Sequence, residues 1–246
     1  MKLFVEQYGD RYRLLKIEPR YGVKKKEHLF DPSEDVHSLS AREVSEKLDN
    51  NISRARSRIL ELGYCNKWEY FCTLTLDGQK RDRYDLDGFV KKLGEWIAHY
   101  NRKYGVKLKY LLIPEQHKDG AYHMHGLMSG VSPDSLIKNK FGYLDMPFYA
   151  QRFGFISLDP IRDEDKTVSY ITKYITKDAS STNVEVGRHL FYASRGLSGK
   201  RRIAVFDVPK SYKMDFENEW VGISWRKENF EDEILKIICE EENFHE

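Results

Sequence analysis

The sequence predicts an α+β fold in which helices pack on one side of a mainly antiparallel sheet. Runs rich in aromatic and β-branched residues recur along the chain and alternate with longer segments whose apolar residues repeat at helical spacing. Two of the strand-like runs are joined by a short polar turn, which predicts a β-hairpin and hence antiparallel pairing.

The predicted elements of the first half follow in order. Residues 2–30 carry short alternating apolar patterns, which suit a small hairpin or an extended arm. From Ser38, a serine start signal and an apolar stripe predict one long helix or two short ones, ending near Gly63. The segment YFCTLTLD at 70–77 has strand composition, and the apolar periodicity of 86–104 predicts a helix.

The second half begins with the predicted hairpin, formed by LKYLLIPEQ (108–116) and YHMHGLMSG (122–130) across the turn HKDGA. Four segments complete the order: a short helix at 133–141, a strand at 153–161, a helix at 167–179 and a last strand at 201–208. The chain is thereby divided into an N-terminal arm with a helical extension (1–65), a central domain (66–210) and an acidic C-terminal tail (211–246).

Composition is that of a globular protein without a membrane segment. The chain has 246 residues, 40% of them hydrophobic and 33% charged, and no apolar run approaches the roughly 20 residues that span a bilayer. Its first residues alternate charged and apolar side chains too closely for a signal peptide, so we expect a cytoplasmic location. Three scattered cysteines predict neither a disulfide framework nor a cysteine zinc site.

Charge is unevenly distributed along the chain. Residues 66–212 hold 24 basic and 17 acidic side chains, whereas residues 213–246 hold 4 and 11. A basic middle suits phosphate binding, although many basic domains bind no nucleic acid. The acidic end, residues 231–246, predicts a short amphipathic helix that is either solvated or in contact with a partner or with basic surface.

The motif AYHMHGLM places two histidines on one face of a predicted strand. Alternate residues of a strand share a face, so His123 and His125 point the same way and are able to share a metal ion. Glu115, at the end of the preceding strand, is the expected third ligand, with Gln116 and His117 as alternatives nearer the turn. Such a set accepts Mn²⁺, Mg²⁺, Fe²⁺ or Zn²⁺. Two half-exposed histidines without a metal are the other interpretation of this motif.

The helix predicted at 167–179 carries two tyrosines and two lysines at one edge. At about 100° per residue, Tyr170, Lys173, Tyr174 and Lys177 fall within a sector of roughly 100°. The apolar stripe beside them consists of Val168, Ile171 and Ile175. The tyrosines are either reactive groups beside the histidines or side chains packed at the margin of the core.

Together these groups suggest attack of a tyrosine on DNA. A tyrosine hydroxyl has a reference pKa near 10 and is a weak nucleophile at neutral pH. It can attack a phosphodiester if a metal neutralises the scissile phosphate and a lysine steadies the developing charge. The product would be a 5′-phosphotyrosyl link and a free 3′-OH, and a second tyrosine allows a second cut while the first DNA end is held.

The motifs resemble those of the HUH endonucleases of the rolling-circle replication initiator type. Three appear in order: a Phe-x-Thr-Leu-Thr strand at 71–75, a His-hydrophobic-His strand at 123–125, and Tyr-x-x-Lys at 170–173 and again at 174–177. The doubled tyrosine looks most like the initiators of microviruses and related small single-stranded DNA phages. The resemblance covers roughly residues 66–210.

This resemblance implies an RRM-like or ferredoxin-like palm that nicks and rejoins single-stranded origin DNA with one divalent ion, Mg²⁺ or Mn²⁺. It implies Glu115, His123 and His125 as metal ligands and Tyr170 and Tyr174 as nucleophiles, with the lysines beside them. Expected partners are single-stranded or origin DNA and a host helicase and polymerase, since the sequence has no Walker-type Gly-x-x-x-x-Gly-Lys-Ser/Thr run.

The basic stretch YASRGLSGKRR adds candidate contacts to DNA. Arg195, Lys200 and Arg201 lie in it and suit either the DNA backbone or a solvated loop.

Other functions stay open at this stage. A plasmid initiator, relaxase or transposase of the HUH class would share the chemistry, and a metal-dependent hydrolase would use water in place of tyrosine. A non-catalytic RRM-like protein would bind nucleic acid by stacking alone.

Overall fold

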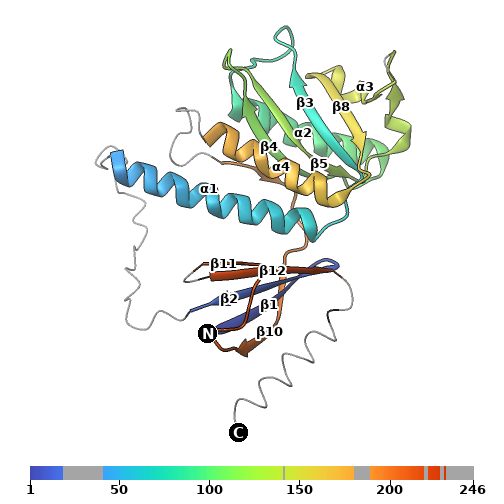
Figure 1. Cartoon of the computed structure of the whole chain (residues 1–246). Coiled ribbons are helices and arrows are strands. Elements are labelled where there is room, and N and C mark those ends of the chain that lie inside the picture. The colour runs from blue at the N-terminus through green and yellow to red at the C-terminus, as the bar shows by residue number, and fades with distance from the viewer. Residues whose placement is uncertain (19–40, 141, 180–188, 219–220, 228–229, 231–246) are drawn as a thin grey trace. The chain divides into compact units, whose positions relative to one another are not determined.

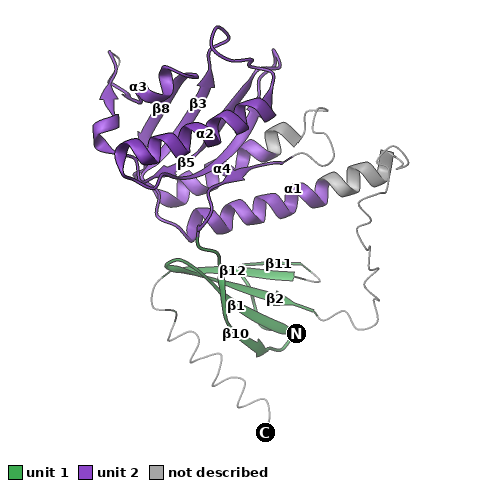
Figure 2. Ribbon diagram, turned by 180° about the vertical axis from the view of Figure 1, so that it is seen from behind, with its two compact units in different colours: residues 1–38, 198–246 green, residues 39–197 purple. Residues whose placement is uncertain are grey.

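The structure, a computed structural model of the chain, describes residues 1–18, 41–140, 142–179, 189–218, 221–227 and 230, without the side chains of 41–48 and 176–179. Two compact units divide the chain, one formed by residues 1–38 and 198–246 and the other by residues 39–197 (Figure 2). These limits differ from the ranges 1–65, 66–210 and 211–246 expected from the sequence, because the two ends of the chain share one unit.

The larger unit is α+β and contains an antiparallel sheet of order β6-β7-β8-β3-β5-β4-β9 (Figure 1). Its elements are α1 (Ala41–Tyr64), β3 (Tyr70–Leu76), α2 (Leu86–Tyr104), β4 (Lys109–Gln116), β5 (Tyr122–Ser129), the 3₁₀ turn η2 (Pro133–Ser135), β6 (Ile137–Lys138), β7 (Leu144–Asp145), α3 (Pro147–Ala150), β8 (Gly154–Pro160), α4 (Glu164–Ala179) and β9 (Tyr192–Ala193). The predicted fold class is confirmed.

Helices cover both faces of this sheet. Helix α2 packs Trp96 and Tyr100 on the face that buries Cys72 and Met124. Helices α1 and α4 lie side by side and cover part of the other face, in a second core. That core is built from Ala55, Ile59, Leu62, Leu111, Ile113, Leu127, Val168, Ile171 and Ile175. The expectation of helices on one side is therefore wrong, because β4 buries consecutive residues, 111–113, and thus has an apolar side chain on each face.

Local signals explain the limits of α2. The Asp85 side chain accepts a hydrogen bond from the Gly88 amide, which caps the first turn. Gly105 ends the helix in the left-handed region, at φ 63°.

The segment expected to form a short helix at 133–141 behaves differently. Pro133 starts only one 3₁₀ turn, and residues 137–138 then pair with β7 as the edge strand β6. Both side chains of β6 are exposed, so the segment has no apolar face that would stabilise a longer helix.

The smaller unit is an antiparallel sheet of order β10-β1-β2-β12-β11. Its strands are β1 (Lys2–Tyr8), β2 (Arg11–Ile17), β10 (Arg201–Asp207), β11 (Phe216–Glu217) and β12 (Val221–Lys227). The predicted N-terminal hairpin is confirmed as β1 and β2. The predicted last strand forms as β10, but it pairs with β1 and does not join the sheet of the larger unit.

The predicted acidic helix at 231–246 lies outside the described residues. Within the ranges that are described, no helix is long and apolar enough to cross a membrane.

Candidate active site

The two histidines lie at the centre of the larger sheet. Strand β5 runs between β3 and β4, and alternation places His123 and His125 on one face and the fully buried Met124 on the other. The imidazoles therefore share a face, as the sequence predicts, while Met124 anchors the strand in the core under α2.

Glu115 reaches this pair from β4. It lies directly opposite His123 in the strand register, and its Oε2 accepts a hydrogen bond from His125 Nε2 at 2.8 Å. Glu115 is only 7% exposed, so the contact is shielded from water. The hairpin thus brings the predicted carboxylate to the predicted histidines.

Two threonines of β3 hold the other nitrogens of these rings. Thr73 Oγ1 lies 3.1 Å from His125 Nδ1, and Thr75 Oγ1 lies 3.1 Å from His123 Nδ1. A hydroxyl can accept from an Nδ1–H, which leaves the Nε2 lone pair free to bind another group. Sequence reasoning treated FCTLT as mainly structural. Its Thr-x-Thr alternation was the available signal, but the pairing of β3 with β5 was needed to see whom the threonines contact.

His123 is neutral at physiological pH. Burial, followed by the neighbouring His117, His125 and Arg83, lowers the pKa of His123 to about 4, against an opposing effect of Glu115. A neutral imidazole is the form that donates a lone pair to a metal.

The alternative ligands near the turn have other roles. The exposed His117 stacks on His123, with ring centres 3.9 Å apart. Gln116 Nε2 donates to the Gly120 carbonyl at 3.0 Å and so closes the hairpin turn.

Helix α4 presents both tyrosines beside the histidines. Its apolar stripe of Val168, Ile171 and Ile175 is buried in the core, as predicted. The Tyr174 ring stacks on His125, with centres 4.1 Å apart and 13° between the planes. Its hydroxyl donates a hydrogen bond to the Tyr170 hydroxyl at 2.9 Å.

The two tyrosines differ in environment. Tyr170 is 47% exposed, whereas Tyr174 is half-buried. Burial, the hydrogen bond to Tyr170, and the proximity of Tyr170 and Glu115 raise the pKa of Tyr174. Tyr174 is therefore a proton donor at neutral pH, and its hydrogen bond is directed at the more accessible oxygen.

Phe71 of β3 completes the aromatic cluster. Its ring meets Tyr170 edge-on at 5.7 Å between centres. It is nearly parallel to His125 and Tyr174, at 6.3 and 6.5 Å. The exposed Lys173 has its Nζ 5.9 Å from the centre of the Tyr170 ring. Lys177 belongs to α4, but its side chain lies outside the described residues.

The fit of the histidine cluster to a metal is partial. Among the residues that the structure describes, no three or more His, Cys, Asp or Glu side chains are grouped so that they could hold a metal ion. Neighbouring ligands of an octahedral Mg²⁺ with bonds of about 2.1 Å lie about 3 Å apart. The 2.8 Å between Glu115 and His125 is compatible with that spacing. His123 would be the third ligand, and the structure holds it against Thr75 and His117.

The predicted DNA-contacting residues are divided between the two units. Arg195 is exposed in the turn after β9 of the larger unit. Lys200 and Arg201 belong to the smaller unit, where Lys200 pairs with Glu6 at 2.6 Å and Arg201 donates to Gln7 at 2.7 Å.

Comparison with known proteins gives one family match. Residues 69–179 match the family model for replication-associated proteins of the ORF2 type. The matched segment extends from just before β3 to the end of α4 and contains Glu115, both histidines and both tyrosines. No curated protein and no solved structure is significantly similar to the chain. The family match supports a role as a rolling-circle replication initiator, which implies binding to DNA.

Proposed function

We propose that the chain is a replication initiator of the HUH endonuclease type, which nicks and rejoins single-stranded origin DNA through a 5′-phosphotyrosine link. The observation that carries the proposal is a series of contacts running from Glu115 through His125 and Tyr174 to Tyr170. All four residues lie in the segment that matches the replication-associated family.

Tyr170 is the first nucleophile in this proposal. Its hydroxyl is the more exposed of the two, and its oxygen accepts the hydrogen bond from Tyr174. A donated hydrogen bond stabilises the phenolate more than the neutral phenol, which favours the nucleophilic form. Tyr174 acts first as this donor and is then placed to receive the second DNA end.

The transfer conserves the number of phosphate ester bonds. The Tyr170 oxygen loses its proton to solvent and attacks the phosphorus, so an O–P bond forms to tyrosine. The bond between phosphorus and the 3′ oxygen breaks, and that oxygen takes up a proton to leave as a 3′-OH. Rejoining is the reverse, with a 3′-OH attacking the phosphotyrosine. No nucleotide cofactor is consumed, because one ester replaces another.

Glu115, His123 and His125 would hold the divalent cation, Mg²⁺ or Mn²⁺. When bound, the cation supplies neutralisation of charge on the scissile phosphate. Thr73 and Thr75 fix the orientation of the imidazoles through Nδ1. The Lys173 ammonium, next to Tyr170, is available for the charge that develops on the phosphate. Unwinding and synthesis are left to a host helicase and polymerase.

The proposal is tested by covalent capture. The protein is mixed with labelled single-stranded oligonucleotides from a candidate origin and Mn²⁺, and is run on a denaturing gel beside an EDTA control. We expect a shifted band for the wild type and for Tyr143→Phe, which alters an exposed tyrosine outside the cluster. The combined Tyr170→Phe and Tyr174→Phe variant should give none. Nicking without an adduct in that double variant would instead indicate a hydrolase that uses water.

A nucleic-acid-binding protein without nuclease activity is the second candidate. It is favoured by the observation that no three-ligand group is assembled among the described residues. The same gel separates the two candidates, since such a protein would bind the oligonucleotides in a native assay and form no adduct with any of them.

A further inference from the structure

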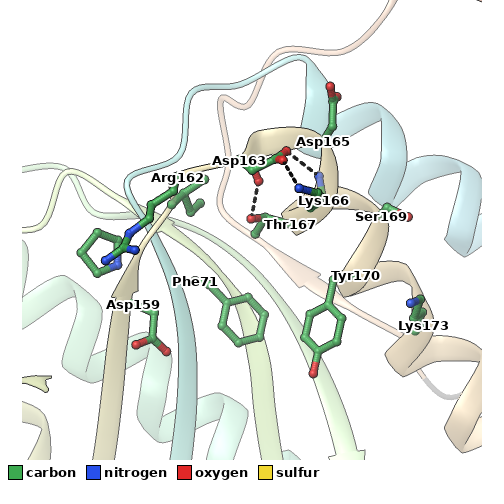
Figure 3. A pocket seen from close by; sticks show the side chains of 12 residues that line it. Phe71, Asp159, Arg162, Asp163, Asp165, Lys166, Thr167, Ser169, Tyr170 and Lys173 are labelled. Atoms are coloured by element: carbon green, nitrogen blue, oxygen red, sulfur yellow. Dashed lines mark hydrogen bonds and ion pairs between the residues drawn. The ribbon is translucent and has the colours of Figure 1, made fainter.

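A cavity of about 700 Å³ opens beside Tyr170. It lies between β3, the end of β8 and the first turns of α4 (Figure 3). Its lining includes Phe71, Asp159, Arg162, Lys166, Tyr170 and Lys173. Glu115 and the two histidines do not line it, so the proposed chemistry leaves the cavity without a role.

One wall of the cavity combines a carboxylate with an aromatic ring. The register of β3 and β8 pairs Phe71 with Asp159, which places both side chains on the same face of the sheet. Figure 3 shows Asp159, Phe71 and Tyr170 projecting in the same direction from three neighbouring elements. A flat ligand lying against Phe71 would thus have Asp159 at its edge and the Tyr170 hydroxyl close by.

The carboxylate of Asp159 is uncommitted. It is exposed, and it makes no hydrogen bond or ion pair with any residue that the structure describes. Asp163, in the same lining, is by contrast engaged with Lys166, through the amide at 3.0 Å and the ammonium at 3.1 Å. Arg162 is exposed and likewise has no partner among the described residues. The cavity therefore offers one available acceptor and one available cation.

These groups match a nucleobase in single-stranded DNA. Aromatic side chains stack on the faces of unpaired bases, and a carboxylate accepts hydrogen bonds from base N–H groups. Guanine presents two such donors side by side, its ring N–H and its amino group, which suit the two oxygens of one carboxylate. Thymine presents a carbonyl on each side of its single ring N–H and would leave carboxylate and carbonyl oxygens facing each other. Arg162 and Lys173 supply positive charge for the adjoining phosphates.

We infer that this cavity is a base-recognition subsite in which Asp159 selects a guanine next to the scissile phosphate. The inference rests on the proposed nicking function for its position along the DNA. Base selection itself requires neither the metal nor the tyrosine hydroxyls, and it can therefore be measured separately.

The test is equilibrium binding in EDTA, where no cleavage is expected. Four fluorescein-labelled octamers are compared by anisotropy: oligo-dT, and oligo-dT with a single central G, A or C. A good bidentate contact discriminates by about 1–3 kcal/mol, or roughly 5- to 150-fold. We expect the wild type to bind the octamer with guanine at least about 10-fold more tightly than oligo-dT.

Asp159→Asn replaces one acceptor oxygen by a donor at almost unchanged size, and should reduce this preference to less than about 3-fold. The matched control, Asp134→Asn, alters another exposed aspartate that does not line the cavity and should keep the preference. Phe71→Leu should weaken binding of all four octamers alike, because stacking is insensitive to the identity of the base.

Equal binding of the four octamers, preference for any base other than guanine, or a guanine preference that survives in Asp159→Asn would overturn the subsite. The gel for covalent capture is scored independently. A guanine preference without any adduct would support the subsite and contradict the nicking function, whereas an adduct without base preference would do the opposite.

Discussion

At the scale of single residues, the hydrogen bond between the two tyrosines gives them different roles. Tyr174 donates and is stacked on His125, while Tyr170 accepts and is more exposed. We predict that Tyr170→Phe reduces the first adduct to background. Tyr174→Phe removes a hydrogen bond to a charged oxygen, worth about 1.5–3 kcal/mol, and should slow adduct formation roughly 10- to 150-fold. Initial rates of adduct formation under single-turnover conditions measure both. Equal losses in the two variants, or a greater loss in Tyr174→Phe, would contradict this order.

The threonines of β3 act on the histidines and not on DNA. Replacing Thr75 by Val keeps the shape of the side chain and removes the hydroxyl that contacts His123 Nδ1. Partners of this kind typically change metal affinity about 10- to 100-fold. We therefore predict that Thr75→Val raises the Mn²⁺ concentration for half-maximal adduct formation by about 10-fold or more. Affinity for single-stranded DNA in EDTA should stay unchanged, and a parallel loss of that affinity would instead indicate a general structural defect.

Side-chain periodicity was sufficient to predict the histidine pair, the glutamate and the tyrosine edge of α4, because each depends on spacing within one or two adjacent elements. Thr73 and Thr75 were not assigned a role, since their histidine partners lie on a strand far along the chain and depend on which strand lies beside β3. The same is true of Asp159, whose position next to Phe71 follows only from the pairing of β8 with β3.

At the scale of elements, Gly126 sets how closely β4 and β5 approach. A Cβ at this position would clash with the Leu111 carbonyl oxygen and lie 2.7 Å from a methyl carbon of Leu112. Gly126→Ala must push the strands apart, and overpacking of this kind costs about 1–3 kcal/mol. We predict a lower urea midpoint together with reduced adduct formation, because the contact between Glu115 and His125 spans these strands.

Gly94 is the matched control for that substitution. It lies within α2, and a Cβ there would meet nothing within 4 Å. Gly94→Ala should stabilise the protein by about 0.5–1 kcal/mol, because alanine loses less backbone entropy in a helix. Destabilisation by Gly94→Ala and not by Gly126→Ala would refute the packing argument.

In the smaller sheet, Glu6 joins β1, β2 and β10. It is 1% exposed and accepts hydrogen bonds from Arg13 Nε at 3.0 Å and Lys200 Nζ at 2.6 Å. Burial raises the pKa of Glu6, but the hydrogen bonds and charges of Lys200 and Arg13 outweigh it and leave the pKa below its usual value. A carboxylate with a lowered pKa in the folded state stabilises the fold above its unfolded pKa, near 4.3, and loses this effect as pH falls through the folded value.

We therefore predict that Glu6→Gln lowers the free energy of unfolding at pH 7 by about 2 kcal/mol, the scale of a hydrogen bond to a charged group. The difference from the wild type should be constant above about pH 5 and shrink towards pH 3. Urea titrations across this range measure it. Asp207→Asn, which breaks the exposed pair with Lys2, should have little effect and serves as the control. A difference that grows on acidification would contradict the assignment.

Element types were largely predictable from the sequence, whereas their assembly was not. The hairpin of β4 and β5 and the helices α2 and α4 follow from local periodicity and short turns. The partner of β10 is β1, at the opposite end of the chain, and no local pattern identifies a pairing at that distance. The short 3₁₀ turn at Pro133 was mistaken for a helix because proline favours the first turn of both.

At the scale of the whole molecule, the candidate chemistry belongs to one unit. Glu115, both histidines, both tyrosines and the cavity next to Tyr170 all lie within residues 39–197. The family match is confined to the same unit. The smaller unit has its own apolar core and holds Lys200 and Arg201 in polar contacts of its sheet. Nicking is therefore expected to depend on the larger unit, and the basic residues of the smaller unit are expected to affect DNA affinity more than cleavage.

The most direct test of the central claim is to locate the covalent bond. The wild-type protein is reacted with a single-stranded origin oligonucleotide and Mn²⁺, digested with nuclease and trypsin, and analysed by mass spectrometry. The account predicts a nucleotide attached through a 5′ phosphate to Tyr170, with a minor share on Tyr174 and none after EDTA treatment. A phosphonucleotide on a residue outside α4, or cleaved DNA with no modified peptide, would contradict it.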